Sequence, residues 1–230
     1  MINTLIVGAS MSGLACAACL RGYDIDYQLV EQHDQIATPW RNHYDRLHLH
    51  THKGGSSLPY KKFSRHLPRY PSRQQVIEYL EDYQKTFHIQ PQFNTRALKI
   101  KHVAGAWITE TTHGVFRSQH LIMATGAFSK PKHIDFPGLD TFPGEVLHSS
   151  GYRTAKGFHG KKVLVVGFGN SACEIAIDLY EQGAIPSMSV RSPVNIVPRD
   201  LLGLPIAQIS LLLSLLSSPL SAFIAIMQRS

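Results

Sequence analysis

Two glycine-rich turns, each directly following a short strand-like run, constrain the fold more than any other feature of the sequence. The first turn spans residues 8–13 (GASMSG) after the run 2–7, and the second spans residues 167–172 (GFGNSA) after the run 161–166. Each leads into a helix-like segment and then into another apolar run. The order strand, glycine turn, helix, strand is the βαβ unit of a Rossmann fold. The sequence therefore predicts an α/β protein with two Rossmann-like dinucleotide-binding domains.

The first turn carries the residues that a dinucleotide site needs. Gly8 permits the tight turn, and Gly13 allows the following helix to lie close to the strand. The N-terminus of that helix presents free N–H groups to a pyrophosphate. Glu31, at the end of the next strand, can accept hydrogen bonds from ribose hydroxyls. Ser10 replaces the usual second glycine, and its hydroxyl either contacts the phosphate or weakens binding.

The second turn differs from the first in the residue that follows its second strand. Gly167 and Gly169 occupy the first two glycine positions, and Asn170 and Ser171 begin the helix. Arg191 stands where the first site has its glutamate. A guanidinium can pair with the extra phosphate of NADP through two hydrogen bonds, whereas a carboxylate would repel it. The second site is therefore predicted to bind NADPH rather than NADH.

The region between the two turns predicts one long helix and a small meander. Ser72 and Gln75 form a capping-box pattern at the start of a helix whose apolar residues continue to Phe87. Three alternating segments then predict an antiparallel meander at 97–103, 106–110 and 115–117.

A separate buried strand, residues 119–126, is predicted to follow the meander. It closes on Thr125 and Gly126. Glycine at the carboxyl end of a strand allows the backbone to approach a nucleotide closely. These two residues are therefore candidates for cofactor binding.

A connection rich in proline and glycine lies between the two sites and carries the pattern F-x-G-x-x-x-H-x-x-x-Y, from Phe142 to Tyr152. This spacing resembles the identifying sequence of the flavin-containing (class B) monooxygenases. Residues 42–50 (NHYDRLHLH) and 161–171 (KKVLVVGFGNS) are most similar to the YUCCA branch, the indole-3-pyruvate monooxygenases. Phe142 is expected to anchor the connection in the core, and His148 and Tyr152 to project toward the cleft.

The resemblance implies FAD in the first site and NADPH in the second. In such enzymes NADPH reduces the flavin, and molecular oxygen then adds to the reduced flavin to give a hydroperoxide. The hydroperoxide transfers one oxygen atom to a small organic substrate. The substrate would be a 2-oxo acid such as indole-3-pyruvate, or a compound with a soft nitrogen or sulfur centre. His50 stands where the wider family has an asparagine that supports the flavin and the YUCCA-like branch has histidine. Trp40 and Asn42 are candidates for contact with the flavin edge, although core packing explains Trp40 nearly as well. No catalytic acid–base pair is predicted.

The same resemblance divides the chain into residues 1–150, the first part of an FAD-binding domain, residues 151–200, the start of an NADP-binding domain, and residues 201–230, an apolar helical segment. The resembled family continues further, so the chain looks short at its C-terminus. Residues 201–227 contain no charged side chain and two prolines. A helical pair that is buried or lies at a membrane surface is favoured over a spanning helix.

Composition limits the partners. The net charge of +7 fits an anionic ligand, but without a basic run or an aromatic array nucleic acid is not predicted. Three cysteines are too few for a disulfide framework, which indicates a reducing, cytoplasmic compartment. His48, His50 and His52 have no acidic or cysteine partner nearby in sequence, so no metal site is predicted. The expected partners are the small-molecule substrate and molecular oxygen, and no oligomeric state is predicted.

Two other functions remain open. A pyridine-nucleotide disulfide oxidoreductase would need a redox cysteine pair facing a flavin. Cys16 and Cys19 lie mid-helix among alanines, where packing explains them, and Cys173 stands alone. The other function is a nucleotide-binding module without catalytic activity, which a purified chain lacking flavin would favour.

Overall fold

The computed structural model describes residues 1–127, 130–132, 136–206 and 208–210. They form two compact units. The first unit comprises residues 1–48 and 57–153, and the second comprises residues 49–56 and the described residues from 154 onward. Each unit contains one of the two glycine-rich turns.

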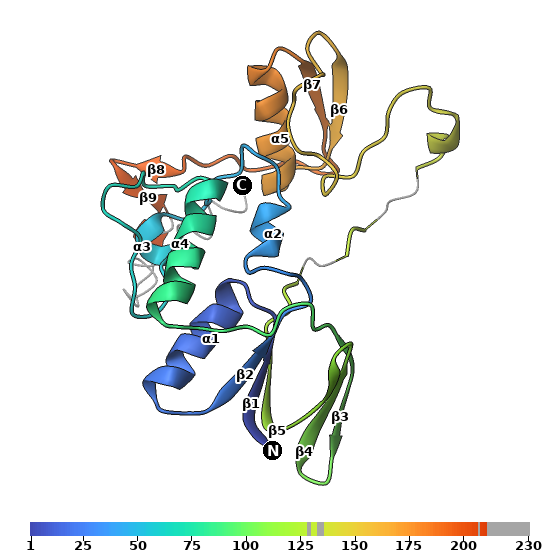
Figure 1. The fold of residues 1–230 in the computed structure, drawn as a ribbon. Coiled ribbons are helices and arrows are strands. Elements are labelled where there is room, and N and C mark those ends of the chain that lie inside the picture. Colours follow the sequence, from blue (N-terminus) through green and yellow to red (C-terminus); the bar gives the residue numbers. More distant parts are fainter. Residues whose placement is uncertain (128–129, 133–135, 207, 211–230) are drawn as a thin grey trace, which may run out of the picture. The chain divides into compact units, whose positions relative to one another are not determined.

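A mixed sheet and the helices that pack beside it form the first unit (Figure 1). Among the described residues it has five strands in the order β2-β1-β5-β4-β3. β1 (Ile2–Val7) pairs in parallel with β2 (Tyr27–Val30) on one side and with β5 (Gly114–Met123) on the other. β4 (Ala106–Thr111) pairs antiparallel with β5 and with β3 (Ala97–Val103). The predicted α/β class and meander are confirmed, and the carboxyl ends of β1, β2 and β5 share one edge of the sheet.

β5 is one continuous strand that ends at Met123, whereas the sequence predicted two separate strands at 115–117 and 119–126. The second was predicted to be buried, but the residues of β5 after Ser118 are half-buried or exposed. Ser118 lies between these pieces, is fully buried, and pairs with Trp107 on β4 and with Ile2 on β1. Neither glycine nor proline interrupts residues 115–123, so the extended backbone continues from the antiparallel part into the parallel part. The predicted break was wrong, and β5 joins the meander to the edge that carries the first glycine turn.

Helices pack against the sheet and against one another in the first unit. α1 (Met11–Gly22) contacts β1 and β2, and α4 (Arg73–Thr86) packs against α1 and α2 (Thr38–Arg41). Each large apolar side chain that these elements bury contributes about 1.5–3 kcal/mol on leaving water. The fully buried ones include Leu5, Ile6, Leu14, Leu29, Val76 and Leu80. A short 3-10 helix, Leu139–Thr141, lies in the connection between the predicted sites.

Ser72 caps α4 as the sequence predicted. Its hydroxyl accepts a hydrogen bond from the Gln75 backbone N–H at 3.4 Å, and its own N–H donates to the Gln75 side chain at 2.9 Å. We expect Ser72→Ala to lower the free energy of unfolding by about 1 kcal/mol, because one N–H of the first turn loses its acceptor. Urea denaturation measures this loss. Gln74→Ala, at an exposed position of the same turn, is the control; an equal loss there would contradict the capping role.

The described residues of the second unit contain a parallel pair of strands and one long helix. β6 (Lys162–Val166) pairs with β7 (Ile185–Ser189), and α5 (Asn170–Glu181) connects the two strands and packs against both. Asp178 on α5 is buried, and its carboxylate accepts a hydrogen bond from the Ala155 N–H at 3.0 Å. The second βαβ unit predicted from the sequence is confirmed. The four-residue helix α3 (Lys53–Ser56) belongs to the same unit.

Residues 200–205 form a hairpin of β8 (Asp200–Leu201) and β9 (Leu204–Pro205). Leu202 and Gly203 both have positive φ, as a two-residue hairpin turn of type I′ requires. The apolar helical segment predicted for residues 201–230 therefore does not begin at residue 201. Residues 207 and 211–230 lie outside the described residues. In the part of the chain that the structure describes, no helix has both the length and the apolar character needed to cross a membrane.

Candidate nucleotide-binding sites

The first glycine turn lies against the end of β5. Gly8 follows β1 with a φ of +105°, and its N–H donates to the Val30 carbonyl at 2.8 Å. A Cβ atom on Gly8 would lie 2.5 Å from the carbonyl oxygen of Ala124, just beyond β5. Only glycine combines this φ with so close an approach. The turn and the end of β5 are therefore packed backbone to backbone.

Gly13 permits a still closer approach at the start of α1. A Cβ atom on Gly13 would lie 1.8 Å from the carbonyl oxygen of Gly8, so a side chain there would have to displace the turn. The first turn of α1 thus lies directly on the glycine turn, and its leading N–H groups have no intrahelical acceptors. Ser10 is the N-cap residue of α1, and within the described chain its side chain makes no capping hydrogen bond. The Ser10 hydroxyl is therefore not used to cap the helix.

Glu31 holds the turn from the end of β2. Its buried carboxylate accepts hydrogen bonds from the backbone N–H groups of Ala9 at 2.7 Å and His33 at 3.0 Å. A carboxylate retains further acceptor sites after two such bonds. A negative charge is thus fixed beside the turn, where a ribose hydroxyl can donate to it.

We expect Glu31→Gln to lower the free energy of unfolding by about 1–3 kcal/mol. The amide nitrogen of glutamine cannot accept a hydrogen bond, so the N–H of Ala9 or of His33 loses its partner. Urea denaturation without added ligand measures the effect. Glu78→Gln, on an exposed position of α4, is the matched control and should change stability by less than about 0.5 kcal/mol. Wild-type stability of Glu31→Gln would show that the carboxylate does not hold the turn.

Thr125 and Gly126 lie at the same edge of the sheet as the first turn. The Ala124 N–H donates to the Val7 carbonyl at 2.9 Å, which extends the pairing of β1 and β5 by one residue. Gly126 has a φ of +77°, and both predicted residues are exposed. The structure therefore places Glu31, Thr125 and Gly126 at the same edge of the sheet as the predicted residues of the first turn.

The other predicted flavin contacts lie outside the sheet. Trp40 is half-buried on α2, and Asn42 is exposed at the C-cap of that helix. His50 is exposed in the segment 49–56, which groups with the second unit. Their roles in cofactor contact stay predictions.

The second glycine turn has a similar backbone geometry but more open surroundings. Gly167 follows β6 with a φ of +117°, and its N–H donates to the Ser189 carbonyl at 2.8 Å. Gly169 is the N-cap residue of α5, and a Cβ atom there would meet no described atom within 4 Å. Asn170 and Ser171 form the first turn of α5. A phosphate can therefore approach this backbone without a side chain in its way.

Arg191 is exposed just beyond the end of β7. In the first unit Glu31 directly follows β2. The two βαβ units thus carry opposite charges at corresponding points, as the sequence predicted.

The motif at 142–152 lies differently from the prediction. Phe142 is 56% exposed, and its ring covers Gly144 instead of entering the core. Tyr152 is buried and meets the ring of Tyr44 edge-on, with 6.4 Å between the ring centroids. The expectations that Phe142 anchors the motif and that Tyr152 projects into a cleft were wrong. The aromatic anchor is the tyrosine at the other end of the motif.

Hydrogen bonds fix the same end of the motif to the segment after α2. The Asp45 N–H donates to the Arg153 carbonyl at 2.8 Å, and the Arg153 guanidinium donates to the His43 carbonyl at 3.1 Å. His148 interacts with Ser150, two residues on, through its Nδ1 atom. The sequence of residues 42–50 and that of the motif at 142–152 both resemble the monooxygenase family, but neither predicted that the two segments contact each other.

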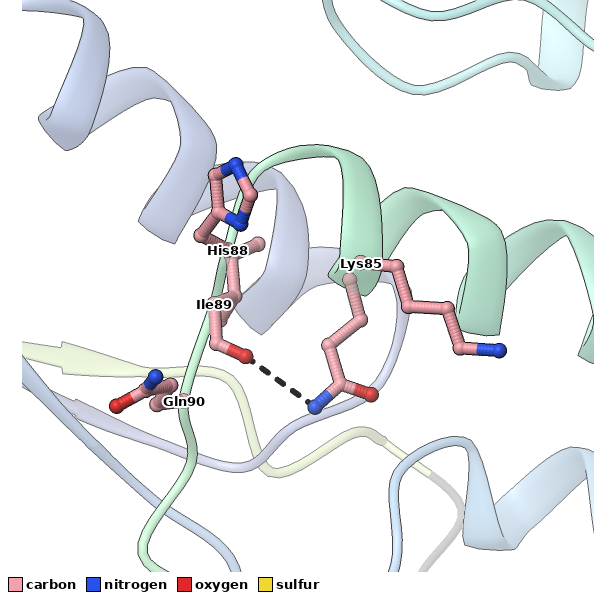
Figure 2. Close-up of a pocket in the computed structure, with 5 residues that line it drawn as sticks. Lys85, His88, Ile89 and Gln90 are labelled. Carbon is pink, nitrogen blue, oxygen red and sulfur yellow. Dashed lines mark hydrogen bonds between the residues drawn. The ribbon is translucent and has the colours of Figure 1, made fainter.

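An open depression lies at the C-terminal end of α4 (Figure 2). The Gln84 side chain donates to the Ile89 carbonyl across it at 3.2 Å. Its lining residues are Gln84, Lys85, His88, Ile89 and Gln90, none of which is a predicted cofactor-binding residue.

The three cysteines are free thiols on helices, Cys16 and Cys19 on α1 and Cys173 on α5. Burial raises the pKa of the Cys16 thiol, and the neighbouring Cys19 raises this pKa further. A raised pKa keeps a thiol protonated and therefore poorly reactive. The C-x-x-C pair is therefore better explained by packing than by disulfide exchange.

Within the described residues, no group of three or more His, Cys, Asp and Glu side chains could hold a metal ion.

Comparison with known proteins places this geometry in a family. The family model described as pyridine nucleotide-disulphide oxidoreductase matches residues 5–198. The chain is 42% identical over 203 residues to the probable indole-3-pyruvate monooxygenase YUCCA4 of Arabidopsis thaliana, a match that covers 87% of this chain and 49% of that protein. The chain therefore spans about half the length of the curated relatives it matches.

Solved structures share the fold. The flavin-containing monooxygenase from Stenotrophomonas maltophilia matches with a TM-score of 0.80 at 24% identity, over 87% of this chain and 61% of that one. The structure of OTEMO in complex with FAD and NADP matches with a TM-score of 0.69 at 24% identity, over 84% of this chain and 39% of that one. The resemblance to flavin-containing monooxygenases seen in the sequence is confirmed. The chain belongs to the pyridine nucleotide-disulphide oxidoreductase family and is similar to indole-3-pyruvate monooxygenases.

Proposed function

We propose that this chain forms the FAD-binding unit and the beginning of the NADPH-binding unit of a flavin-dependent monooxygenase, which transfers one oxygen atom from molecular oxygen to a small organic substrate. One observation carries the proposal. Two glycine turns of similar geometry occur in one chain, with the carboxylate of Glu31 after the second strand of one unit and the guanidinium of Arg191 after that of the other. Such a pair fits two different dinucleotides, as hydride transfer from NADPH to a flavin requires.

The residues of the first unit fit FAD. The turn from Gly8 to Gly13 and the N-terminus of α1 offer backbone N–H groups to a pyrophosphate. The Glu31 carboxylate, already fixed by two backbone N–H groups, can accept hydrogen bonds from ribose hydroxyls. Thr125 and Gly126 are exposed at the same edge, where the backbone can contact the nucleotide. The OTEMO complex with FAD and NADP, which has the same fold, supports this pair of cofactors.

The residues of the second unit fit NADPH. The open space at Gly169 allows close approach of a pyrophosphate, and Asn170 and Ser171 begin a twelve-residue helix whose first N–H groups have no intrahelical acceptors. Arg191 can pair with the phosphate that distinguishes NADPH from NADH. With both nucleotides bound, NADPH supplies the hydride and the flavin supplies the oxygen chemistry. The residues of this chain bind and orient the two nucleotides.

A 2-oxo acid such as indole-3-pyruvate is the substrate that we propose. The support is the 42% identity to a probable indole-3-pyruvate monooxygenase over most of this chain. The sequence resemblance also allows a second class of substrate, compounds with a soft nitrogen or sulfur centre. A thioether represents this class in the activity test below.

The test is to purify the full chain, incubate it with FAD, remove free flavin and record the visible flavin spectrum. Oxidation of NADPH and of NADH is then followed in air, with indole-3-pyruvate, with a thioether and without substrate. We expect stoichiometric flavin, a preference for NADPH, and oxygenated product from the 2-oxo acid. A chain that holds no flavin overturns the proposal, and product from the thioether alone overturns the proposed substrate. Flavin without any oxygenated product would identify a nucleotide-binding module.

A further inference from the structure

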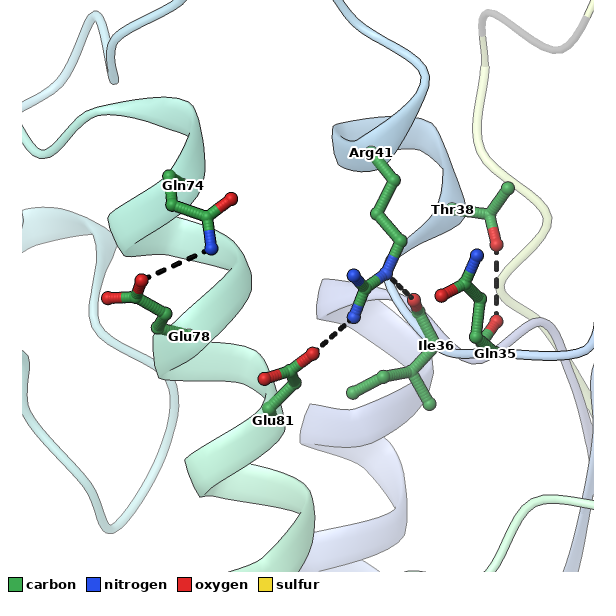
Figure 3. A network of polar contacts seen from close by, with 7 residues as sticks. All are labelled: Gln35, Ile36, Thr38, Arg41, Gln74, Glu78 and Glu81. Carbon is green, nitrogen blue, oxygen red and sulfur yellow. Dashed lines mark hydrogen bonds and ion pairs between the residues drawn. The ribbon is translucent and has the colours of Figure 1, made fainter.

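A single peptide unit, between Ile36 and Ala37, links the first glycine turn to Arg41; Figure 3 shows its contact with Arg41. The carbonyl and the N–H of the peptide between Ile36 and Ala37 point in opposite directions, as in every trans peptide. On one side the Ile36 carbonyl accepts a hydrogen bond from Arg41 Nε at 3.1 Å. On the other side the Ala37 N–H donates to the Ala9 carbonyl at 3.1 Å. Ala9 is the second residue of the glycine turn, and its own N–H is bound to Glu31.

Ala37 needs such support because its backbone is strained. It has a φ of +59° and a ψ of 21°, which is the left-handed region that L residues rarely adopt. The residue is fully buried, and its carbonyl accepts hydrogen bonds from the N–H groups of Trp40 and Arg41 as α2 begins. A strained conformation persists only where its surroundings fix it. The hydrogen bonds on both sides of the Ile36–Ala37 peptide provide that support.

Arg41 is held by two residues of α4, Glu81 and Arg73. Its guanidinium pairs with Glu81 on α4, as Figure 3 shows. Its carbonyl accepts a hydrogen bond from Arg73 Nη1 at 2.8 Å, and Arg73 also pairs with Asp45 at 2.9 Å. Arg41 therefore connects α4 to the peptide that contacts the turn.

We propose that Arg41 is a positioning residue for cofactor binding: by holding the Ile36–Ala37 peptide, it fixes the Ala9 carbonyl and thereby the shape of the phosphate-binding turn. The inference rests on the proposed function, because its consequence for binding assumes that this turn holds FAD. A hydrogen bond from a charged donor to one end of a peptide polarises that peptide and strengthens the bond made by its N–H. Arg41 acts on the turn in this way without touching the nucleotide.

Three variants separate this role from a simple ion pair. Arg41→Lys keeps the charge and the pairing with Glu81, but a lysine lacks the planar fork that reaches Glu81 and the Ile36 carbonyl together. Glu81→Gln removes the charge of the partner and leaves the bond to Ile36. Arg117→Lys, at an exposed position of β5, is the matched control.

The first measurement is hydrogen exchange of individual amides by NMR, on protein without flavin. Arg41→Lys should lower the protection of the Ala37 amide by about tenfold relative to core amides such as that of Leu80. The second measurement is titration of flavin-free protein with FAD, in which Arg41→Lys should raise the dissociation constant by about tenfold. Glu81→Gln should have smaller effects, and Arg117→Lys none.

Wild-type protection of Ala37 in Arg41→Lys would overturn the inference, whether or not the chain binds FAD. An equal loss of protection at Ala37 and Leu80 would also overturn it, because Arg41 would then affect only global stability. Lower protection with unchanged FAD affinity would refute the consequence for binding. If the wild-type chain binds no FAD, the proposed function fails, and exchange at Ala37 still decides whether Arg41 positions the turn.

Discussion

Gly13→Ala is expected to abolish stable flavin binding and to lower the free energy of unfolding by about 2–4 kcal/mol. The new Cβ atom would lie 1.8 Å from the carbonyl oxygen of Gly8, which is backbone and cannot rotate away. Either α1 must move off the turn or the turn must open, and both changes separate the N–H groups that would hold a pyrophosphate. The flavin-to-protein ratio after gel filtration measures the first effect, and urea denaturation measures the second.

Gly22→Ala is the matched control because it introduces the same methyl group at the other end of the same helix. A Cβ atom there would meet the Tyr60 hydroxyl at 3.6 Å, which is ordinary contact. We expect flavin binding to be unchanged and stability to be equal or slightly higher, since alanine favours a helix more than glycine does. Normal flavin content in Gly13→Ala would show that the turn does not bind the cofactor in this geometry.

Arg191→Glu should lower kcat/KM for NADPH by about a hundredfold, because the variant loses charge-assisted hydrogen bonds and gains a repulsive charge. The effect on NADH should be less than about threefold, since NADH has no phosphate at that position. Initial rates of oxidation of the two nucleotides, measured over a range of concentrations, give both values.

Lys156→Glu makes the same change of charge at an exposed residue of the second unit, outside the βαβ element. It controls for long-range electrostatic effects and should alter the use of both nucleotides equally and slightly. Losses of similar size for NADPH and NADH in Arg191→Glu would contradict the assignment of Arg191 to the distinguishing phosphate.

The βαβ units were predictable because their determinants are local. Gly8 and Gly13 are close in sequence, and the backbone conformations that they allow follow from the absence of a side chain. The Ser72–Gln75 cap is likewise determined within one helical turn. Patterns of this length are read directly from sequence, and the structure confirms them.

Contacts between distant segments were not predictable. Glu81 lies forty residues after Arg41, and helical periodicity gives the face of α4 on which it lies but not its partner. Tyr44 and Tyr152 belong to separate family-like segments, and their ring contact depends on the path of the chain between them. The exposure of Phe142 could not be predicted for a similar reason. An aromatic residue beside glycine and proline can either enter the core or, as Phe142 does, lie against a neighbouring glycine.

The continuity of β5 has a consequence for the order of folding. β3, β4 and β5 are joined by tight turns and can pair early, whereas β5 must find β1 at a great sequence separation, with Ile2 opposite Ser118. Closing so long a loop costs entropy before any contact compensates for it. Since Gly8 abuts Ala124, we expect the ability to bind a nucleotide to emerge only in this late closing step. A chain that has formed the meander but not yet paired β5 with β1 would be partly folded and unable to bind the nucleotide.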